Sequence, residues 1–223
     1  QSQPRPPFER MLMSKKNEIE DLITAGNKSI VDESWQEGLS IWKKLDGLLP
    51  DNAGILMNVS CCLSNIGNHN ESLEILNKVD KLLPLNPEVH YSKGSCYDFL
   101  KDYEEAIKSY TKCLDINKNH IDAWIRLALC HRRLHNPEKA IEIYKHILTS
   151  YEQKIEYVIE LASALFEFEK YEEAENYLQQ ILNNDRDNEL AKKTLSRIYH
   201  HTGRKSEAIQ LEKDAEGSFT FST

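Results

Sequence analysis

The sequence predicts an all-α fold built from repeated antiparallel helix pairs. One short segment recurs every 34 residues without a slip in register, and apolar residues follow one another at the i, i+4 and i+7 spacing of a helix face. The chain of 223 residues contains only 8 glycines and 7 prolines. This scarcity permits long helices and argues against a loop-rich β fold.

The recurring segment consists of Glu or Lys followed by a very small residue. Its copies begin at Trp35, His69, Tyr103, Pro137, Tyr171 and Lys205, and their small residues are Gly38, Ser72, Ala106, Ala140, Ala174 and Ala208. A second small position precedes each copy, at Gly26, Ser60, Gly94, Ala128, Ala162 and Ser196. A side chain kept small at a fixed position indicates a close helix crossing. We therefore expect small residues to face small residues within each helix pair.

The period divides the chain into three parts. Residues 1–18 are expected to be a Pro-containing N-terminal segment, partly disordered or vector-derived, because Gln1 is not a natural start. Six repeats follow, and residues 217–223 are expected to form a flexible tail. The predicted repeats cover residues 19–52, 53–86, 87–120, 121–154, 155–188 and 189–216.

Helix breakers lie where these repeats require them, taken in order along the chain. Pro50 and Pro84 fall just past the second helices of the first two repeats, and Pro137 begins the second helix of the fourth. Gly67 and Gly203 fall in the turn between the two helices of a pair. The first repeat is the least regular, because its first helix lacks large apolar residues.

These patterns resemble the tetratricopeptide repeat (TPR). The resemblance rests on the run from Trp124 to Ala128, on Gly94 with Tyr97, and on the pairs Tyr103/Ala106 and Tyr171/Ala174. It covers residues 19 to about 216. The resemblance implies a right-handed superhelix of antiparallel helix pairs, in which first helices line a concave groove that binds a partner protein.

Composition limits the partners and the compartment. The formal net charge of −8 disfavours nucleic acid and membrane as partners. Five cysteines, an odd number without paired spacing, indicate buried thiols in a reducing compartment rather than a disulfide framework. We expect a cytoplasmic protein, with the nucleus not excluded, and no cofactor.

No catalytic or metal motif emerges from the chain, so we expect neither an enzyme nor a metal site. His131 and His135 have the i, i+4 spacing of a metal pair, but His131 falls at a core position. Cys62, Cys96 and Cys130 recur 34 residues apart, which stacked repeats hold too far apart for a shared zinc ion.

The resemblance implies that partner binding falls on first-helix residues that do not enter the core. The middle of this set combines aromatic residues with arginines, a common composition at interfaces. The candidate groove residues are Asn27, Asn58, Asn65, Tyr91, Ser95, Phe99, Arg126, Arg132, Arg133, Phe166, Lys193 and Arg197.

The leading hypothesis is a scaffold or adaptor that holds a peptide or helix of a protein partner. A self-associating module, possibly a homo-oligomer, or the regulatory arm of a larger protein is the alternative. Binding of an acidic chaperone tail is disfavoured, because Ile23, Glu88 and Ser92 stand where the clamp of that TPR class has cations. A basic stripe, open to an acidic protein or to nucleic acid, comprises Lys192, Lys193, Arg197, Arg204 and Lys205.

Overall fold

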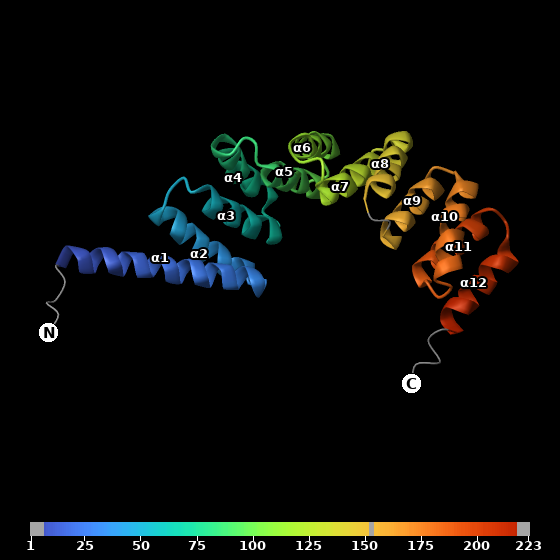
Figure 1. The fold of residues 1–223 in the computed structure, drawn as a ribbon, viewed down its shortest axis with the longest axis horizontal. Coiled ribbons are helices and arrows are strands. Elements are labelled where there is room, and N and C mark those ends of the chain that lie inside the picture. The colour runs from blue at the N-terminus through green and yellow to red at the C-terminus, as the bar shows by residue number, and fades with distance from the viewer. Residues whose placement is uncertain (1–6, 152–153, 218–223) are drawn as a thin grey trace. The chain divides into compact units, whose positions relative to one another are not determined.

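The computed structural model describes residues 7–151 and 154–217, and α-helix is the only regular secondary structure in them. The all-α prediction is therefore confirmed. The chain divides into two units, Gln1–Lys118 and Asn119–Thr223, which contain helices α1 to α6 and α7 to α12 (Figure 1). Each unit is described by itself, and the handedness of the superhelix stays a prediction.

Unit 1 contains three helix pairs. Its first helix begins at Pro7, twelve residues before the first repeat is expected to begin, so residues 7–18 are helical. Of the N-terminal segment predicted from the sequence, only residues 1–6 lie outside the described residues. The helices are α1 (Pro7–Val31), α2 (Trp35–Leu48), α3 (Ala53–Asn65), α4 (His69–Leu82), α5 (Pro87–Phe99) and α6 (Tyr103–Ile116).

Unit 2 also contains three helix pairs. Its last helix ends at Gly217, and the rest of the predicted C-terminal tail lies outside the described part of the chain. Among the described helices of both units, none combines the length and the hydropathy that a bilayer span requires. The helices are α7 (Ile121–Arg133), α8 (Pro137–Ser150), α9 (Ile155–Glu167), α10 (Tyr171–Asn184), α11 (Glu189–His201) and α12 (Lys205–Gly217).

The residue before each first helix explains why these helices begin where they do. From α3 onwards this residue recurs every 34 positions, and in four of five cases its side chain accepts a hydrogen bond from a backbone N–H of the first turn. Only Lys154 makes no such bond. The helix starts coincide with the expected starts of repeats two to six. The capping side chains belong to Asn52, Asn86, His120 and Asn188.

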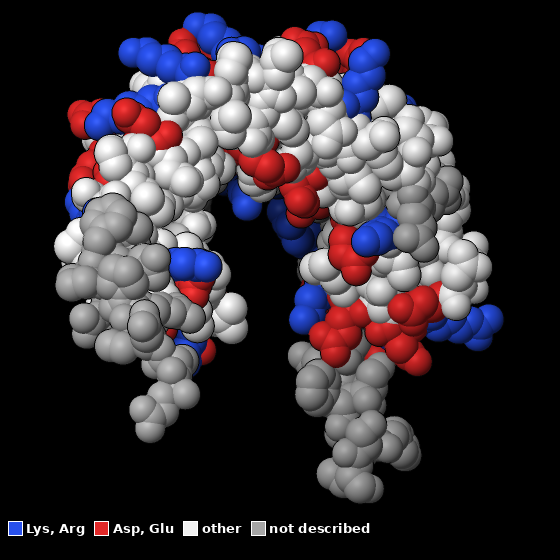
Figure 2. Space-filling model, turned by 60° about the vertical axis from the view of Figure 1, so that its left-hand side comes forward, with Lys and Arg blue, Asp and Glu red and all other residues white. Residues whose placement is uncertain are grey.

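Oppositely charged side chains pair across neighbouring helices of unit 1. Lys43 on α2 lies 2.8 Å from Glu71 on α4, and Lys44 on α2 lies 2.9 Å from Glu18 on α1. Figure 2 shows Lys and Arg side chains beside Asp and Glu side chains at several places on the face that it presents. These exposed pairs contribute little stability.

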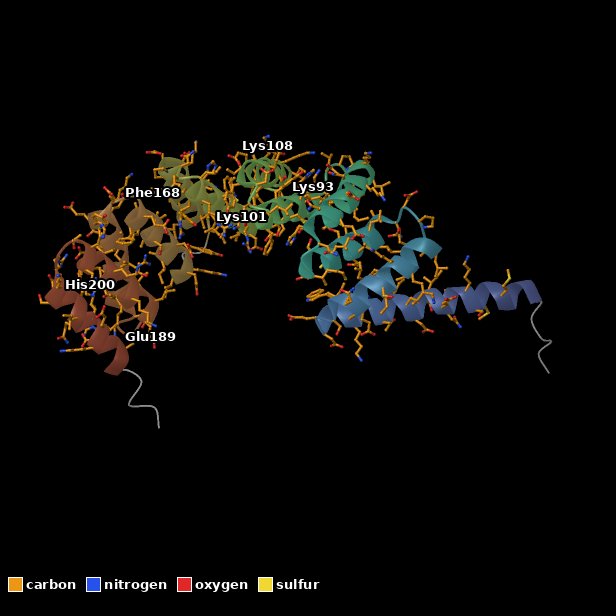
Figure 3. The ribbon with its side chains drawn as sticks, turned by 180° about the vertical axis from the view of Figure 1, so that it is seen from behind. Lys93, Lys101, Lys108, Phe168, Glu189 and His200 are labelled. Atoms are coloured by element: carbon orange, nitrogen blue, oxygen red, sulfur yellow. The ribbon has the colours of Figure 1, made fainter. Side chains whose placement is uncertain are left out.

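The turn inside each helix pair has one conformation throughout the chain. A residue with positive φ recurs every 34 positions, and its neighbour closes the turn onto the preceding helix, as when the Asp102 N–H donates to the Tyr97 carbonyl at 2.9 Å. Lys101, labelled in Figure 3, holds this position between α5 and α6. The positive-φ residues are Glu33, Gly67, Lys101, His135, Glu169 and Gly203.

The small residues do lie where two paired helices come into close contact, but the residue opposite a small residue is not always small. A Cβ atom added at Gly94 would lie 2.6 Å from the buried ring of Tyr110, and one added at Gly26 would lie 2.7 Å from the ring of Trp42. The expectation is thus wrong for these two glycines, whose nearest neighbours are aromatic. The absent side chain makes room for a ring of the paired helix.

In the second pair, by contrast, two small residues do meet through their hydroxyl groups. Ser60 on α3 and Ser72 on α4 lie 2.8 Å apart, and Ser64 also lies 2.8 Å from Ser72. The Ser72 hydroxyl further reaches the Ser60 carbonyl at 3.1 Å, and Cys96 of the next repeat lies 3.2 Å from Ser64. This hydroxyl cluster satisfies polar groups that burial would otherwise leave unpaired.

Candidate functional site

Six of the predicted groove residues lie on the first helices α1, α3 and α5 of unit 1. On α5, Phe99 is 65% exposed, although it belongs to an ordered helix, and Tyr91 and Ser95 are half-buried. The Phe99 ring stacks on the ring of His69 from α4, with the centroids 4.8 Å apart and the planes inclined by 8°. The Phe99–His69 pair therefore forms a fixed aromatic platform.

The neighbouring helix α3 gives this face an uncharged polar character. None of the thirteen residues of α3 is charged. Asn58 is half-buried and Asn65 is exposed, as is Asn27 on α1. The Asn65 amide nitrogen donates to the Cys61 carbonyl at 2.9 Å, which leaves the amide oxygen directed elsewhere. We call the predicted binding positions of α3 and α5, Asn58, Asn65, Tyr91, Ser95 and Phe99, the unit 1 inner face.

In unit 2, Arg132 forms ion pairs with two glutamates of the same chain. Its guanidinium donates to both carboxylate oxygens of Glu167, at 2.7 and 2.8 Å, and to Glu160 at 2.8 Å. Both partners lie on α9, so Arg132 ties α7 to α9 with a bidentate ion pair. Arg132 was predicted as a groove residue from the sequence. Its ion pairs were not predicted, because the two glutamates lie 28 and 35 residues further along the chain.

The structure brings two other predicted residues of unit 2 together. The Arg197 guanidinium on α11 lies 5.0 Å from the centroid of the Phe166 ring on α9, and His201 meets the same ring edge-on at 5.6 Å. Lys193 pairs with Glu189 on its own helix at 3.2 Å. The other predicted residues, Arg126 and Arg133, lie on α7 and are half-buried and exposed respectively.

Family models and solved structures agree with this architecture. Two tetratricopeptide-repeat models match residues 87–120 and 165–215, and the model of anaphase-promoting complex (cyclosome) subunit 3 matches residues 111–181. Together these matches run through residues 87–215, more than half of the chain. The chain is a TPR protein.

Solved TPR structures resemble this TPR protein in fold. A tetratricopeptide repeat protein from Parabacteroides merdae is 20% identical, with 92% of this chain and 80% of the other covered and a TM-score of 0.77. Pseudomonas aeruginosa pilF is 15% identical, covers 94% and 95%, and has a TM-score of 0.70. YrrB, a TPR protein, is 18% identical, covers 78% and 90%, and has a TM-score of 0.62. No curated protein sequence matches the chain. At these identities the likeness shows the fold alone.

The structure divides the predicted basic stripe: Lys193, Arg197 and Lys205 are exposed, whereas Lys192 and Arg204 are engaged within the protein. Lys192 is buried, and its ammonium group donates to Asp187 at 3.3 Å and to the Asp214 carbonyl at 3.2 Å. Arg204 pairs with Glu175 and with Glu207, at 2.7 Å each. The N–H groups of Lys192 and Arg204 are therefore bonded to acceptors of the same chain, and these bonds stabilise the last helix pair.

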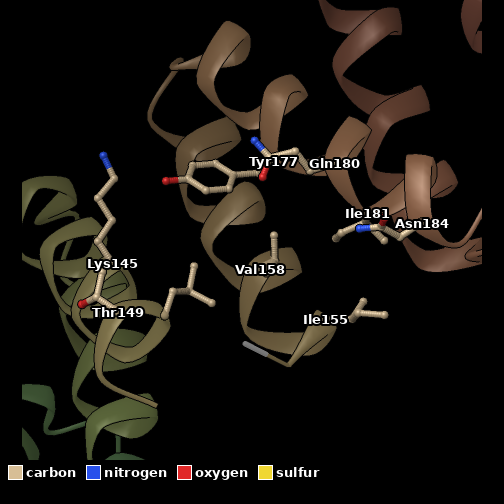
Figure 4. Close-up of a pocket in the computed structure, with 9 residues that line it drawn as sticks. Lys145, Thr149, Ile155, Val158, Tyr177, Gln180, Ile181 and Asn184 are labelled. Carbon is tan, nitrogen blue, oxygen red and sulfur yellow. The ribbon is translucent and has the colours of Figure 1, made fainter. Parts of the chain in front are cut away.

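The TPR array also carries a hollow that the sequence did not reveal. It has a volume of about 430 Å³ and lies between α8, α9 and α10 of unit 2 (Figure 4). Val158 and Ile181 contribute apolar surface, while Thr149 and Tyr177 contribute neutral polar groups. Lys145 at its edge is paired with Glu173. The hollow could receive an apolar side chain, but it contains no convergent set of reactive groups.

The described residues of the TPR array include no group of three side chains able to share a metal ion. All five cysteines are free thiols, and four of them, Cys62, Cys96, Cys113 and Cys130, are buried. Burial raises the pKa of Cys62 to about 11, mainly because the thiolate form would lose its hydration. Buried neutral thiols of this kind are poor nucleophiles.

Proposed function

We propose that this TPR protein is a non-catalytic scaffold or adaptor that holds a segment of a partner protein on the inner face of its first helices. The observation that carries the proposal is the exposed Phe99 ring, stacked on His69 beside the uncharged helix α3. A large aromatic side chain held in place on a surface loses little conformational entropy when it is covered. Such rings are typical anchors of protein interfaces.

The chemistry of the unit 1 inner face favours an extended peptide. An asparagine side chain carries one carbonyl acceptor and an NH₂ donor, which complement the N–H and C=O groups of a peptide backbone. Asn58 and Asn65 lie on α3, and Asn27 lies on α1 of the same unit. We infer that these amides bind the main chain of the partner, while the Phe99–His69 platform receives one of its apolar side chains.

Comparison with other TPR proteins supports this choice of ligand. YrrB is described as a TPR protein with an unusual peptide-binding site. Ile23 on α1, with Glu88 and Ser92 on α5, takes the cation positions of the chaperone-tail clamp, which argues against an acidic chaperone tail as the ligand of unit 1, because a carboxylate needs charge-assisted hydrogen bonds. Self-association through this face, or a role as the arm of a larger protein, remains the alternative. We also propose a cytoplasmic or nuclear location, since all five cysteines are free thiols.

Affinity purification with the full chain as bait tests the proposal. The variant Phe99→Ala removes the platform, and Ile209→Ala on α12, also an exposed apolar position, serves as the matched control. Partners that bind the inner face should be lost with the first variant and retained with the second, while both keep the helical circular dichroism of the wild type. Equal recovery of every partner by both variants would refute the role of the inner face. Sedimentation of the wild type across concentrations distinguishes the self-association alternative.

A further inference from the structure

The loop between α4 and α5 exposes three leucines to solvent. Leu82 is 43% exposed, Leu83 is 40% exposed and Leu85 is 78% exposed. With Pro84, Asn86 and Pro87, these residues line an open hollow of about 480 Å³. We call residues 82–87 the leucine loop. A contiguous apolar patch on an exposed surface is unfavourable unless something covers it, and such patches commonly mark interaction sites.

Hydrogen bonds fix the conformation of the leucine loop. The Leu83 N–H donates to the Val79 carbonyl at 2.8 Å, and the Asn86 N–H donates to the Leu83 carbonyl at 3.2 Å. The Pro84 carbonyl lies 3.2 Å from Nε2 of His90, a buried side chain of α5. Because both ends and the middle of the loop are tied down, the leucines are presented in a fixed arrangement and do not fold back into the core.

The other repeats show that the fold does not require leucine at these positions. One repeat later, the residues equivalent to Leu83 and Leu85 are Asn117 and Asn119, in a turn of the same form. In the fifth repeat, the position of Leu85 is taken by Asp187. Polar residues are the usual choice for such turns. The first repeat does have a leucine, Leu49, at the position of Leu83, where it packs against the core, so Leu85 is the leucine that the turn itself does not require.

Positive charge lies on the α4 side of the leucine loop, while the acid Glu88 follows the loop on α5. Lys78 and Lys81 are exposed on the last two turns of α4, and no ion pair is found for either among the described residues. Lys78 lies one helical turn before Leu82, so the two share a face. Asp80, the acidic residue between the two lysines, forms its ion pair with Lys93 of α5 instead, at 3.0 Å. Lys93 is labelled in Figure 3.

We propose that the leucine loop docks an acidic amphipathic segment of a partner protein. Apolar side chains of the segment cover Leu82, Leu83 and Leu85, and its carboxylates meet Lys78 and Lys81. Charge complementarity selects this occupant, because a basic segment would be repelled and a neutral one would leave both ammonium groups without partners. The surface is separate from the unit 1 inner face, so the proposal does not depend on the function proposed above.

Fluorescence anisotropy with the full chain and two synthetic peptides tests this surface. Both peptides are amphipathic and about 18 residues long, with leucine on one face and either Glu or Lys on the other. The double variant Leu83→Asn with Leu85→Asn installs the residues of the next repeat, so it preserves the turn and the net charge. We expect the acidic peptide to bind the wild type about tenfold more tightly than the basic one, and the double variant to lose about tenfold in affinity for it.

Two further variants complete the test. Charge reversal by Lys78→Glu with Lys81→Glu should invert the preference between the peptides, while Phe99→Ala should leave both affinities unchanged. Equal binding of the acidic peptide by the wild type and the asparagine double variant, at equal helical content, overturns the proposal. Concentration-dependent dimerisation that the same double variant abolishes also overturns it, because a second copy of the chain would then be the occupant.

Discussion

Substituting Gly94 by alanine tests whether small residues mark the close contacts between helices. The added methyl group would lie 2.6 and 2.7 Å from two ring carbons of Tyr110, whereas ordinary van der Waals contact begins near 3.4 Å. Tyr110 is fully buried, so its ring has little room to move. Overpacking of this kind costs about 1–3 kcal/mol, while the helix propensity of alanine returns about 1 kcal/mol.

The expected net loss is therefore up to about 2 kcal/mol, and it is limited because α5 can move outward from α6. The fourth repeat already combines alanine and tyrosine at these two positions, as Ala128 and Tyr144. Gly47 on α2 provides the matched control, because a Cβ atom added there would meet nothing within 4 Å. The variant Gly47→Ala should therefore gain up to about 1 kcal/mol.

Thermal unfolding followed by circular dichroism measures both effects. We expect Gly94→Ala to lower Tm by up to about 8 °C and Gly47→Ala to raise it by about 2–4 °C. If Gly94→Ala proves as stabilising as Gly47→Ala, the two helices are not in close contact at Gly94. The interpretation of the small residues as crossing points would then fail.

Three further predictions concern turns, charge and thiols. Lys101→Gly should stabilise the chain by about 1 kcal/mol in urea unfolding, because Lys101 has a φ of 62° that glycine adopts without strain. Burial acts to raise the pKa of Asp80, but Lys93 and the other cationic neighbours of Asp80 outweigh burial and lower this pKa below the ordinary value of 3.8. The ion pair therefore stabilises the fold above pH 3.8, and this stabilisation is lost as the pH falls through the lowered pKa. Asp80→Asn should accordingly cost up to about 1 kcal/mol at pH 7, and the difference from the wild type in pH-dependent urea unfolding should disappear as the pH falls below the lowered pKa. A thiol reagent should react rapidly with Cys61 alone in the folded protein, since the other four cysteines are buried. After denaturation it should react with all five cysteines. Rapid labelling of more than one thiol in the native state would contradict the burial of the other four.

Periodicity in the sequence was enough to predict the helix pairs. A helix pair that repeats every 34 residues leaves the same trace of small, apolar and capping positions each time, and these traces depend only on local spacing. The turn conformation was visible only at Gly67 and Gly203. Lys101 and Glu169 have the same positive φ, which the flanking helices impose. Because lysine and glutamate do not favour positive φ, these residue types gave no indication of it in the sequence.

The candidate site was less accessible to sequence reasoning, because it depends on which side chains pair across repeats. Phe99 was identified from its position alone, since exposure on a first helix follows from the helical period. The engagement of Arg132 by Glu167 and the burial of Lys192 could not be seen, because each depends on the distance between helices that are far apart in sequence. The leucine loop did have a sequence signal, namely Leu85 where another repeat has Asn119.

The serine hydroxyl groups buried between α3 and α4 have a consequence for how such a chain can change. Repeat genes are commonly thought to grow and diverge by copying one module over another. At Ser72, however, the alanine that other repeats carry would deprive Ser60 and Ser64 of a shared partner, each now 2.8 Å away. The second module is thus matched to its own neighbours, and a shuffled or consensus version of this protein must transplant the three serines together.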